Sequence, residues 1–361
     1  MAHGLRAYEE SLLRSIDFSD VLMQGMLSLL LFAGALHVDL SELRAYPWQV
    51  GALAVLGTLL STCAVGVGMW LVLPLAGLNL PLMHCLLFGA LISPTDPIAV
   101  MGILKSANAP KELELVIAGE SLFNDGVGVA IFSLLLGMPA SGLTPAPGQG
   151  LELLLHEAGG GLLFGFGLGY VTFRLLTSVD NYPVEVLLTL AAVTGGYALA
   201  SELHLSGPLA MVVAWRMIGN HGCALAMSDT TRGDPDMFWE LLDEILNAAL
   251  FVLMGMEVLL VAFSLNELAA VAVVVTVVAR LLTVGLPVRL LPRAFNLPGG
   301  SWKVLTWGGL RGGISVALAL SLPAGPERDT VVALTYGVVV FSILAQGLSI
   351  GYVTRKSIRC H

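Results

Sequence analysis

Charge is scarce in this chain of 361 residues. Lysine, arginine, aspartate and glutamate together make up 12% of it, whereas 56% of the residues are hydrophobic and the mean hydropathy is +0.85. A soluble domain is typically about 25% charged. The composition therefore excludes an ordinary soluble protein and indicates a chain that crosses a membrane several times.

Other scarce features exclude further classes. The four cysteines show no C-x-x-C spacing, and Cys63 and Cys85 fall inside apolar runs, so neither a disulfide framework nor a zinc site is supported. The net charge of −9 is spread thinly without a basic stripe, which argues against a nucleic-acid partner. No Ser–His–Asp set or H-E-x-x-H motif lies at membrane depth, so we expect neither an enzyme nor a cofactor.

Long apolar runs dominate the sequence. A window of about 19 residues predicts about eleven membrane-spanning helices and hence an all-α polytopic fold. A polar tail of residues 1–19 precedes a membrane domain of residues 20–361. The predicted spans are 20–37, 48–73, 80–104, 112–137, 151–176, 183–201, 203–219, 237–261, 267–290, 301–321 and 329–353.

Basic residues predict the orientation of these spans. The loops after odd-numbered spans and the C-terminus hold most of them, whereas the loops after even-numbered spans hold only Arg328. Arg280 and Arg311 lie within spans, and Arg6 and Arg14 in the N-terminal tail depart from the pattern. By the positive-inside rule, the C-terminus is cytoplasmic and the protein is a multi-pass protein of the inner (plasma) membrane. The basic residues on the predicted cytoplasmic side are Arg44, Lys105, Lys111, Arg174, Arg216, Arg232, Arg289, Arg293, Lys303, Arg355, Lys356 and Arg359.

Two spans contain residues that interrupt a helix. The third reads "LLFGALISPTDPIAVMGIL", with Thr95 and Asp96 between two prolines that each lack a backbone N–H. The tenth reads "VLTWGGLRGGISVALAL", with glycine pairs on both sides of Arg311. Such a pair of interrupted spans is typical of transporters built from inverted repeats, with the binding site at the breaks.

The repeat is not complete within this sequence. The two broken spans lie seven spans apart, so spans 1–4 would correspond to spans 8–11, and spans 6 and 7 would lack partners. We therefore expect a full repeat to include two further helices before the first span.

The stretch "GESLFNDGVGVAIF", residues 119–132, places charge in the middle of the fourth span. A charged side chain at the bilayer centre costs ~2.5–3.5 kcal/mol on the lenient insertion scale, so such residues are usually functional. On a helix, Ser121 and Asp125 share one face, and Glu120 and Asn124 share the neighbouring face. Asp125 and Glu120 therefore point in different directions, which suggests two separate roles.

Asp125, with the Ser121 hydroxyl, offers oxygen ligands of the kind that hard cations prefer. Burial also favours the protonated form of a carboxylic acid, so Na⁺ and H⁺ can compete for one residue. Asp96 either adds an oxygen or balances backbone dipoles at the break. Asp125 could instead belong to a structural ion pair, the role that we expect for Glu120 with Arg311.

Two further charges lie within predicted spans. Glu257 and Arg280 either pair with each other, reach a membrane surface or tune the site without contacting the cation. The glycine-dense "AGGGLLFGFGLG", residues 158–169, indicates close helix packing, because neither a strand nor a basic residue accompanies it as in a phosphate-binding loop.

Taken in order, "SPTDPIAV", "GESLFNDGVGVAIF", "SELHLSGPLAMVVA", "FVLMGMEV" and "WGGLRGGISVALALSLP" resemble bacterial Na⁺/H⁺ antiporters of the NhaP type. These belong to the monovalent cation:proton antiporter family with the eukaryotic sodium/proton exchangers. The likeness runs from about Asp20 to the C-terminus. Many relatives carry an acidic residue where this chain has Ala33, and relatives begin with one or two additional spans.

The resemblance implies a homodimer in which each protomer has a dimerisation domain and a mobile core with two crossing discontinuous helices. The core is expected around residues 80–137 and 267–353. By the same resemblance, Asp125 binds the monovalent cation and the proton, and Ser121, Thr95, Asp96 and Asn124 contribute to or support that site. Glu120 and Arg311 are implied to form a stabilising ion pair.

The predicted function is a secondary active antiporter that exchanges Na⁺ for H⁺ by alternating access. The resemblance implies one cation for one proton, whereas the sequence itself leaves the stoichiometry open. The sequence leaves the choice among Na⁺, Li⁺ and K⁺ open, because one buried carboxylate serves each of them. The alternative is a cation channel or pH-gated pore. A channel favours rings of charges around an axis, whereas these charges gather at two broken helices.

Overall fold

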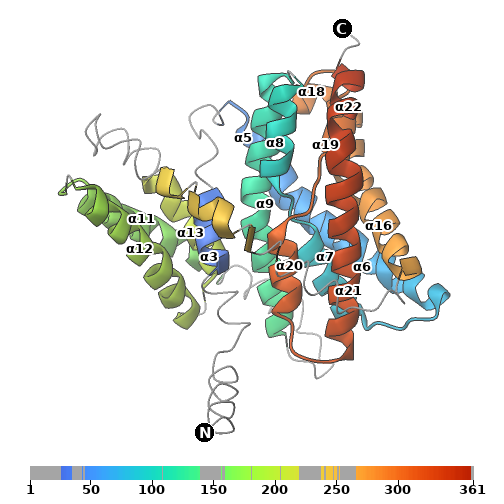
Figure 1. The fold of residues 1–361 in the computed structure, drawn as a ribbon, viewed down its shortest axis with the longest axis horizontal. Coiled ribbons are helices and arrows are strands. Elements are labelled where there is room, and N and C mark those ends of the chain that lie inside the picture. The colour runs from blue at the N-terminus through green and yellow to red at the C-terminus, as the bar shows by residue number, and fades with distance from the viewer. Residues whose placement is uncertain are drawn as a thin grey trace, which may run out of the picture.

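The structure is a computed structural model in which every secondary-structure element of the described residues is helical (Figure 1). The described residues are 26–34, 45–107, 109–138, 159–179, 181–203, 205–218 and 266–358, most of 237–252, and the isolated residues Leu43 and His156. The predicted tail, much of the first and eighth spans, and Glu257 lie outside them.

Apolar composition and length make five helical segments long enough to cross a membrane, counted over the described residues. Their positions agree with five of the predicted spans and confirm the all-α membrane fold. The segments are Pro47–Ala76, Lys111–Gly137, Tyr182–Glu202, Leu268–Leu290 and Pro326–Ile358.

The helices form two groups (Figure 1). The first group holds α3 (Leu27–Gly34), α11 (Gly160–Leu176), α12 (Tyr182–Glu202) and α13 (Gly207–Met217). Gly161, Gly165 and Gly169 recur every four residues along α11, and a Cβ on any of them would run into the backbone of α13 or of Ser206 before it. The glycines therefore let two helices approach closely, as the sequence predicts.

The second group is larger and contains both predicted broken spans (Figure 1). It opens with a long helix made of α5 (Pro47–Gly51), η3 (Ala52–Gly57), α6 (Thr58–Val72) and η4 (Leu73–Ala76). The helices α7 (Leu82–Ile92), α8 (Pro97–Ser106) and α9 (Lys111–Gly137) follow. Later in the chain, the same group contains α16 (Asn266–Arg280), η8 (Leu281–Gly285), α17 (Leu286–Leu290) and α18 (Pro292–Phe295). It ends with α19 (Ser301–Trp307), α20 (Gly313–Leu320), α21 (Pro326–Phe341), η9 (Ser342–Gly347) and α22 (Leu348–Ile358).

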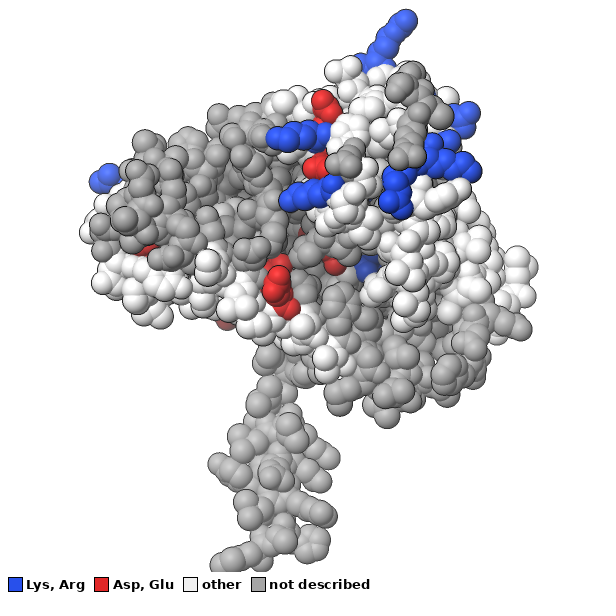
Figure 2. Space-filling model, turned by 45° about the horizontal axis from the view of Figure 1, so that its top comes forward, with Lys and Arg blue, Asp and Glu red and all other residues white. Residues whose placement is uncertain are grey.

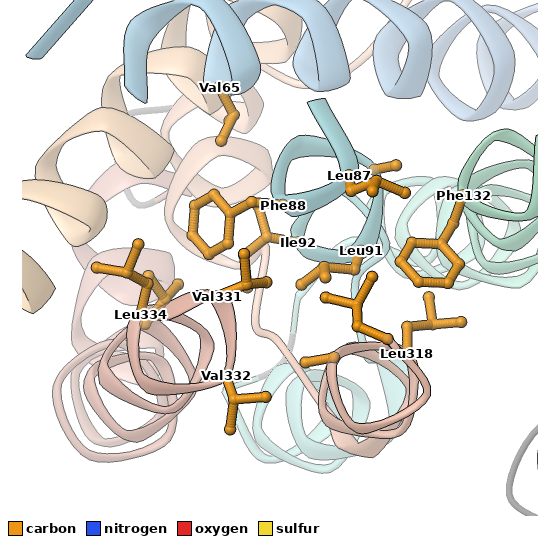
Figure 3. Packing of buried hydrophobic residues seen from close by; sticks show 14 of the residues in the cluster. Val65, Leu87, Phe88, Leu91, Ile92, Phe132, Leu318, Val331, Val332 and Leu334 are labelled. Carbon is orange, nitrogen blue, oxygen red and sulfur yellow. The ribbon is translucent and has the colours of Figure 1, made fainter. Parts of the chain in front are cut away.

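Buried side chains from α7, α9, α20 and α21 fill the centre of the second group (Figure 3). Phe88 and Leu91 of α7 pack near Phe132 of α9, Leu318 of α20 and Val331 of α21. The α7 helix is thus enclosed by apolar neighbours on most sides, which fixes the position of the break that follows it.

The helix at 47–76 joins this second group. The mobile core expected from the family resemblance covers residues 80–137 and 267–353 and does not include this helix. In the structure, α6 packs directly against α7 and α16. A Cβ on Gly89 of α7 would collide with the backbone oxygen of Thr62, so the two helices touch through their backbones.

Both predicted interruptions are present. In the third predicted span, α7 (Leu82–Ile92) ends and a new helix, α8 (Pro97–Ser106), begins after four intervening residues. In the tenth predicted span, α19 (Ser301–Trp307) ends and α20 (Gly313–Leu320) follows after a non-helical stretch. The unbroken α9 (Lys111–Gly137) and the final helix, made of α21 (Pro326–Phe341), η9 (Ser342–Gly347) and α22 (Leu348–Ile358), pack beside them. Proline and glycine at the breaks account for both, because neither supports a continuous helix.

Candidate ion-binding site

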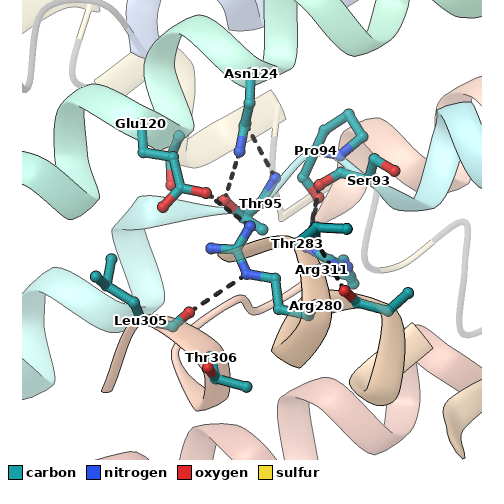
Figure 4. A network of polar contacts seen from close by, with 12 residues as sticks. Ser93, Pro94, Thr95, Glu120, Asn124, Arg280, Thr283, Leu305, Thr306 and Arg311 are labelled. Atoms are coloured by element: carbon teal, nitrogen blue, oxygen red, sulfur yellow. Dashed lines mark hydrogen bonds and ion pairs between the residues drawn. The ribbon is translucent and has the colours of Figure 1, made fainter. Parts of the chain in front are cut away.

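The two breaks meet. The backbone N–H of Asp96 donates a hydrogen bond to the carbonyl of Leu310, at 2.9 Å. Arg311, in the other break, donates through Nη1 to the carbonyl oxygens of Ser93 and Pro94, at 3.3 and 3.1 Å (Figure 4). These carbonyls follow the last turn of α7, where the helix dipole is negative, so the Arg311 cation stabilises the end of the half-helix.

Thr95 is fixed to α9 by three contacts (Figure 4). Its N–H donates to Oδ1 of Asn124 at 3.2 Å, and Nδ2 of Asn124 donates to the Thr95 hydroxyl at 2.9 Å. The hydroxyls of Thr95 and Ser121 lie 2.9 Å apart. All three side chains are at least 98% buried, so the break is held against α9 by satisfied polar contacts rather than by water.

Asp125 follows Asn124 on α9 and lies one turn beyond Ser121, as the spacing predicts. Unlike those two neighbours, it is only partly buried. Asp96 is also partly buried, and a Cβ on Gly312 would come within 2.5 Å of its Oδ2. The glycine therefore leaves room for the Asp96 carboxylate beside the second break.

The charges nearest Asp125 come from three elements. Asp96 and Arg311 in the two breaks and Asp243 in the eighth predicted span all act on it electrostatically. Asp243 is 2% exposed and was missed by the sequence analysis. The sequence feature that could have revealed it is the single aspartate in "FWELLDEILNAALF". Glu240 and Glu244 lie close to it in the sequence, so this stretch is easily mistaken for the solvent-exposed end of a helix.

The predicted Glu120–Arg311 ion pair is wrong in this structure. Glu120 instead pairs with Arg280 of α16, whose Nη1 lies 2.7 Å from Oε1 (Figure 4). Arg280 also donates from Nε to the carbonyl of Leu305, at 3.3 Å. Glu120 and Asp125 do occupy different faces of α9, but the cation that reaches the Glu120 face comes from α16, while Arg311 is engaged by the carbonyls after α7.

Glu120 and Arg280 are 1% and 6% exposed. Two such charges are tolerated only when they neutralise each other, so this pair ties α9 to α16 beside the crossing. Arg280 thus has a partner other than Glu257, the residue considered for it from the sequence.

Ala33 is fully buried in the apolar cluster of the first helix group, with Phe32 and Trp239.

The described residues bring together Thr95, Asp96, Ser121, Asn124 and Asp125 at the first break. They supply two carboxylates, two hydroxyls and an amide. Within the same part of the chain, no three His, Cys, Asp or Glu side chains converge as a resident metal site requires. The set offers oxygen ligands of the kind that hard cations prefer.

Comparison with known proteins agrees with this geometry. The family model described as "Sodium/hydrogen exchanger, transmembrane" matches residues 3–356. The chain belongs to the sodium/hydrogen exchanger family. It is 55% identical over 354 residues to the Na⁺/H⁺ antiporter NhaP of Pseudomonas aeruginosa, covering 96% of this chain and 83% of that protein.

More distant relatives also match almost the whole length of this chain. The Na⁺/H⁺ antiporter NhaH of Halobacillus dabanensis is 34% identical over 357 residues, covering 96% of this chain and 86% of the relative. Among solved structures, the sodium proton antiporter MjNhaP1 of Methanocaldococcus jannaschii superposes with a TM-score of 0.76, at 20% identity, over 96% of this chain and 89% of that one. The fold of this sodium/hydrogen exchanger family member is therefore that of MjNhaP1.

Proposed function

We propose that this family member is a secondary active antiporter that exchanges Na⁺ for H⁺ across the bacterial inner membrane by alternating access. The observation that carries the proposal is the junction of the two broken helices beside Asp125. Membership of the sodium/hydrogen exchanger family supports the same conclusion. The two bacterial relatives cited above are both named Na⁺/H⁺ antiporters, which also supports it.

Asp125 is the residue that we assign to both ions. The residue is partly buried, whereas the adjacent Ser121 and Asn124 are enclosed. A sodium ion would take oxygens from Asp125, Asp96 and the Thr95–Ser121 hydroxyl pair. A proton on Asp125 would cancel the charge that the cation needs, so the two ions bind in competition rather than together.

The charge balance supports exchange instead of simple binding. Asp96 and Asp243 add negative charge near Asp125, whereas Arg311 adds one positive charge. An ionised carboxylate beside like charges in a low-dielectric environment is unfavourable without a cation. Either Na⁺ or H⁺ relieves this cost, so each ion can replace the other while the unloaded site remains rare.

The moving part would be the second helix group, and the first group would provide the scaffold and the dimer contact. This assigns residues 47–76 to the core together with 80–137 and 267–353, because α6 is bound to α7 and α16. The basic ends of α8, α17, α19 and α22 lie together in Figure 1, which supports a cytoplasmic C-terminus by the positive-inside rule.

Proton flux in everted membrane vesicles tests this function. Adding Na⁺, Li⁺ or K⁺ separately should release protons from acid-loaded vesicles, and the concentration that gives half the maximal flux ranks the cations. An antiporter moves Na⁺ only against a counter-moving proton. Sodium conductance in planar bilayers without a proton gradient would instead establish the cation channel and contradict the proposal.

A further inference from the structure

One end of the second helix group is rich in basic residues, and the acidic Glu112 and Glu114 in the first turn of α9 lie at the same end. From Leu268 to the C-terminus the sequence contains only two acidic residues, Glu327 and Asp329, both in the first turn of α21. That turn lies at the opposite end of the group from α18 (Figure 1). Figure 2 shows Lys and Arg side chains gathered over the other end. Those that the structure describes after α16 are Arg289, Arg293, Lys303, Arg355 and Lys356.

A pocket of about 200 Å³ opens in this basic end. It lies between α17, α18 and the start of α19, and its walls include Arg289, Phe295 and Trp302. Gly300 shapes the loop on one side, with φ of +88°, and a Cβ there would run into the carbonyl of Ser357. Glycine is therefore needed to bring the loop against the end of α22.

Arg289 is held in place rather than left free at the surface. Its guanidinium carbon lies 5.1 Å from the centre of the Trp302 ring, and the Lys303 ammonium lies 5.6 Å from the same ring. Such cation–π contacts use the flat face of a guanidinium. The five N–H donors lie in its plane, so they remain suited to bind the oxygens of a phosphate.

An exposed apolar stripe leads along α16, η8 and α17 to this pocket. Its residues recur every four positions, so each one is a neighbour of the next along the helix surface. The stripe spans about 24 Å at 1.5 Å per residue, which exceeds the roughly 15 Å of hydrocarbon in one leaflet. Its members are Val274, Val278, Leu282, Leu286 and Leu290, which are 61%, 46%, 53%, 39% and 66% exposed.

We propose that this pocket binds the headgroup phosphate of an anionic phospholipid, through Arg289 and Lys303 beside Trp302, with an acyl chain along the apolar stripe. Basic pockets at the ends of membrane helices recognise anionic headgroups, and tryptophan favours the headgroup level. The stripe favours a lipid over free phosphate, because only a lipid has an acyl chain that would contact it. The proposal is independent of ion exchange at Asp125.

Thermal unfolding of the purified full chain in detergent tests the proposal. Adding phosphatidylglycerol should raise the melting temperature, whereas phosphatidylcholine should not. Arg289→Gln should lose more than half of the rise. Lys105→Gln removes an exposed charge at the same end, on α8 and outside the pocket, and should keep it. Equal rises with the two lipids, or equal losses in the two variants, would overturn the proposal.

Two further measurements separate the remaining outcomes. Inorganic phosphate alone should give no rise, and a rise as large as that with phosphatidylglycerol would replace the lipid by a free ion. If Arg289→Gln does not fold, tryptophan quenching by brominated lipids takes its place. Brominated phosphatidylglycerol should quench more than brominated phosphatidylcholine, and Trp302→Phe should remove the difference. A difference that survives this substitution would refute the assigned position.

Discussion

Replacing Arg280 by methionine should lower the free energy of unfolding by about 3–5 kcal/mol, because it leaves a buried Glu120 carboxylate without its cation. Glu120 is 1% exposed and its Oε1 lies 2.7 Å from the Arg280 guanidinium. The single variant Glu120→Gln should cost about the same, since it strands the guanidinium with only the Leu305 carbonyl.

The double variant distinguishes an ion pair from two independent residues. If the costs were independent, the two losses of about 3–5 kcal/mol would add to about 6–10 kcal/mol. With both charges gone, neither is stranded, so the double variant should lose no more than either single variant. The coupling energy would then be about 3 kcal/mol or more, well above the ~0.6 kcal/mol average of neutral hydrogen bonds between membrane helices.

Reversible unfolding in mixed detergent micelles, followed by tryptophan fluorescence, gives the four free energies of this cycle. A second cycle between Glu120 and Arg311 is the matched control, because Arg311 is buried nearby but donates to the carbonyls of Ser93 and Pro94. A larger coupling in the Glu120–Arg311 cycle than in the Glu120–Arg280 cycle would refute the pairing described above.

Two glycine substitutions test the packing and the site. Gly89→Ala should destabilise the fold, because its Cβ would meet the backbone oxygen of Thr62, whereas Gly102→Ala has nothing within 4 Å and should be neutral or slightly stabilising in the same melting assay. Equal effects would argue against backbone contact between α6 and α7. Gly312→Ala should displace Asp96, whose Oδ2 would lie 2.5 Å from the new Cβ, and raise the Na⁺ concentration needed for half-maximal exchange several-fold. An unchanged Na⁺ dependence would remove Asp96 from the site.

Local chemistry explains why much of this architecture can be predicted from the sequence. Proline and glycine interrupt helices wherever they occur, so both breaks are visible in "SPTDP" and "GGLRGG". The four-residue spacing of Ser121 and Asp125 places them on one face in any α-helix. The i,i+4 glycines of α11 likewise predict close packing without knowledge of the partner helix.

Partner choice depends on packing that the sequence does not encode locally. Arg280 and Arg311 both lie within apolar spans, and only the approach of α16 to α9 decides which of them meets Glu120. The buried face of the helix at 47–76 carries only the small polar residues Thr58, Ser61 and Thr62, so no charged residue marks its neighbours. Asp243 lies between Glu240 and Glu244 in the sequence, and its burial becomes evident only once Trp239 of the same segment packs against Phe32.

Sodium uptake by the purified protein in liposomes tests the central claim most directly. With an imposed pH gradient, the unmodified protein should accumulate Na⁺ and dissipate the gradient together. Asp125→Asn should abolish both fluxes while the protein still inserts and melts at a similar temperature. Asp329→Asn, which changes an exposed carboxylate at the far end of α21, should retain both. Normal sodium-coupled proton movement in Asp125→Asn would contradict a cation and proton site at this residue.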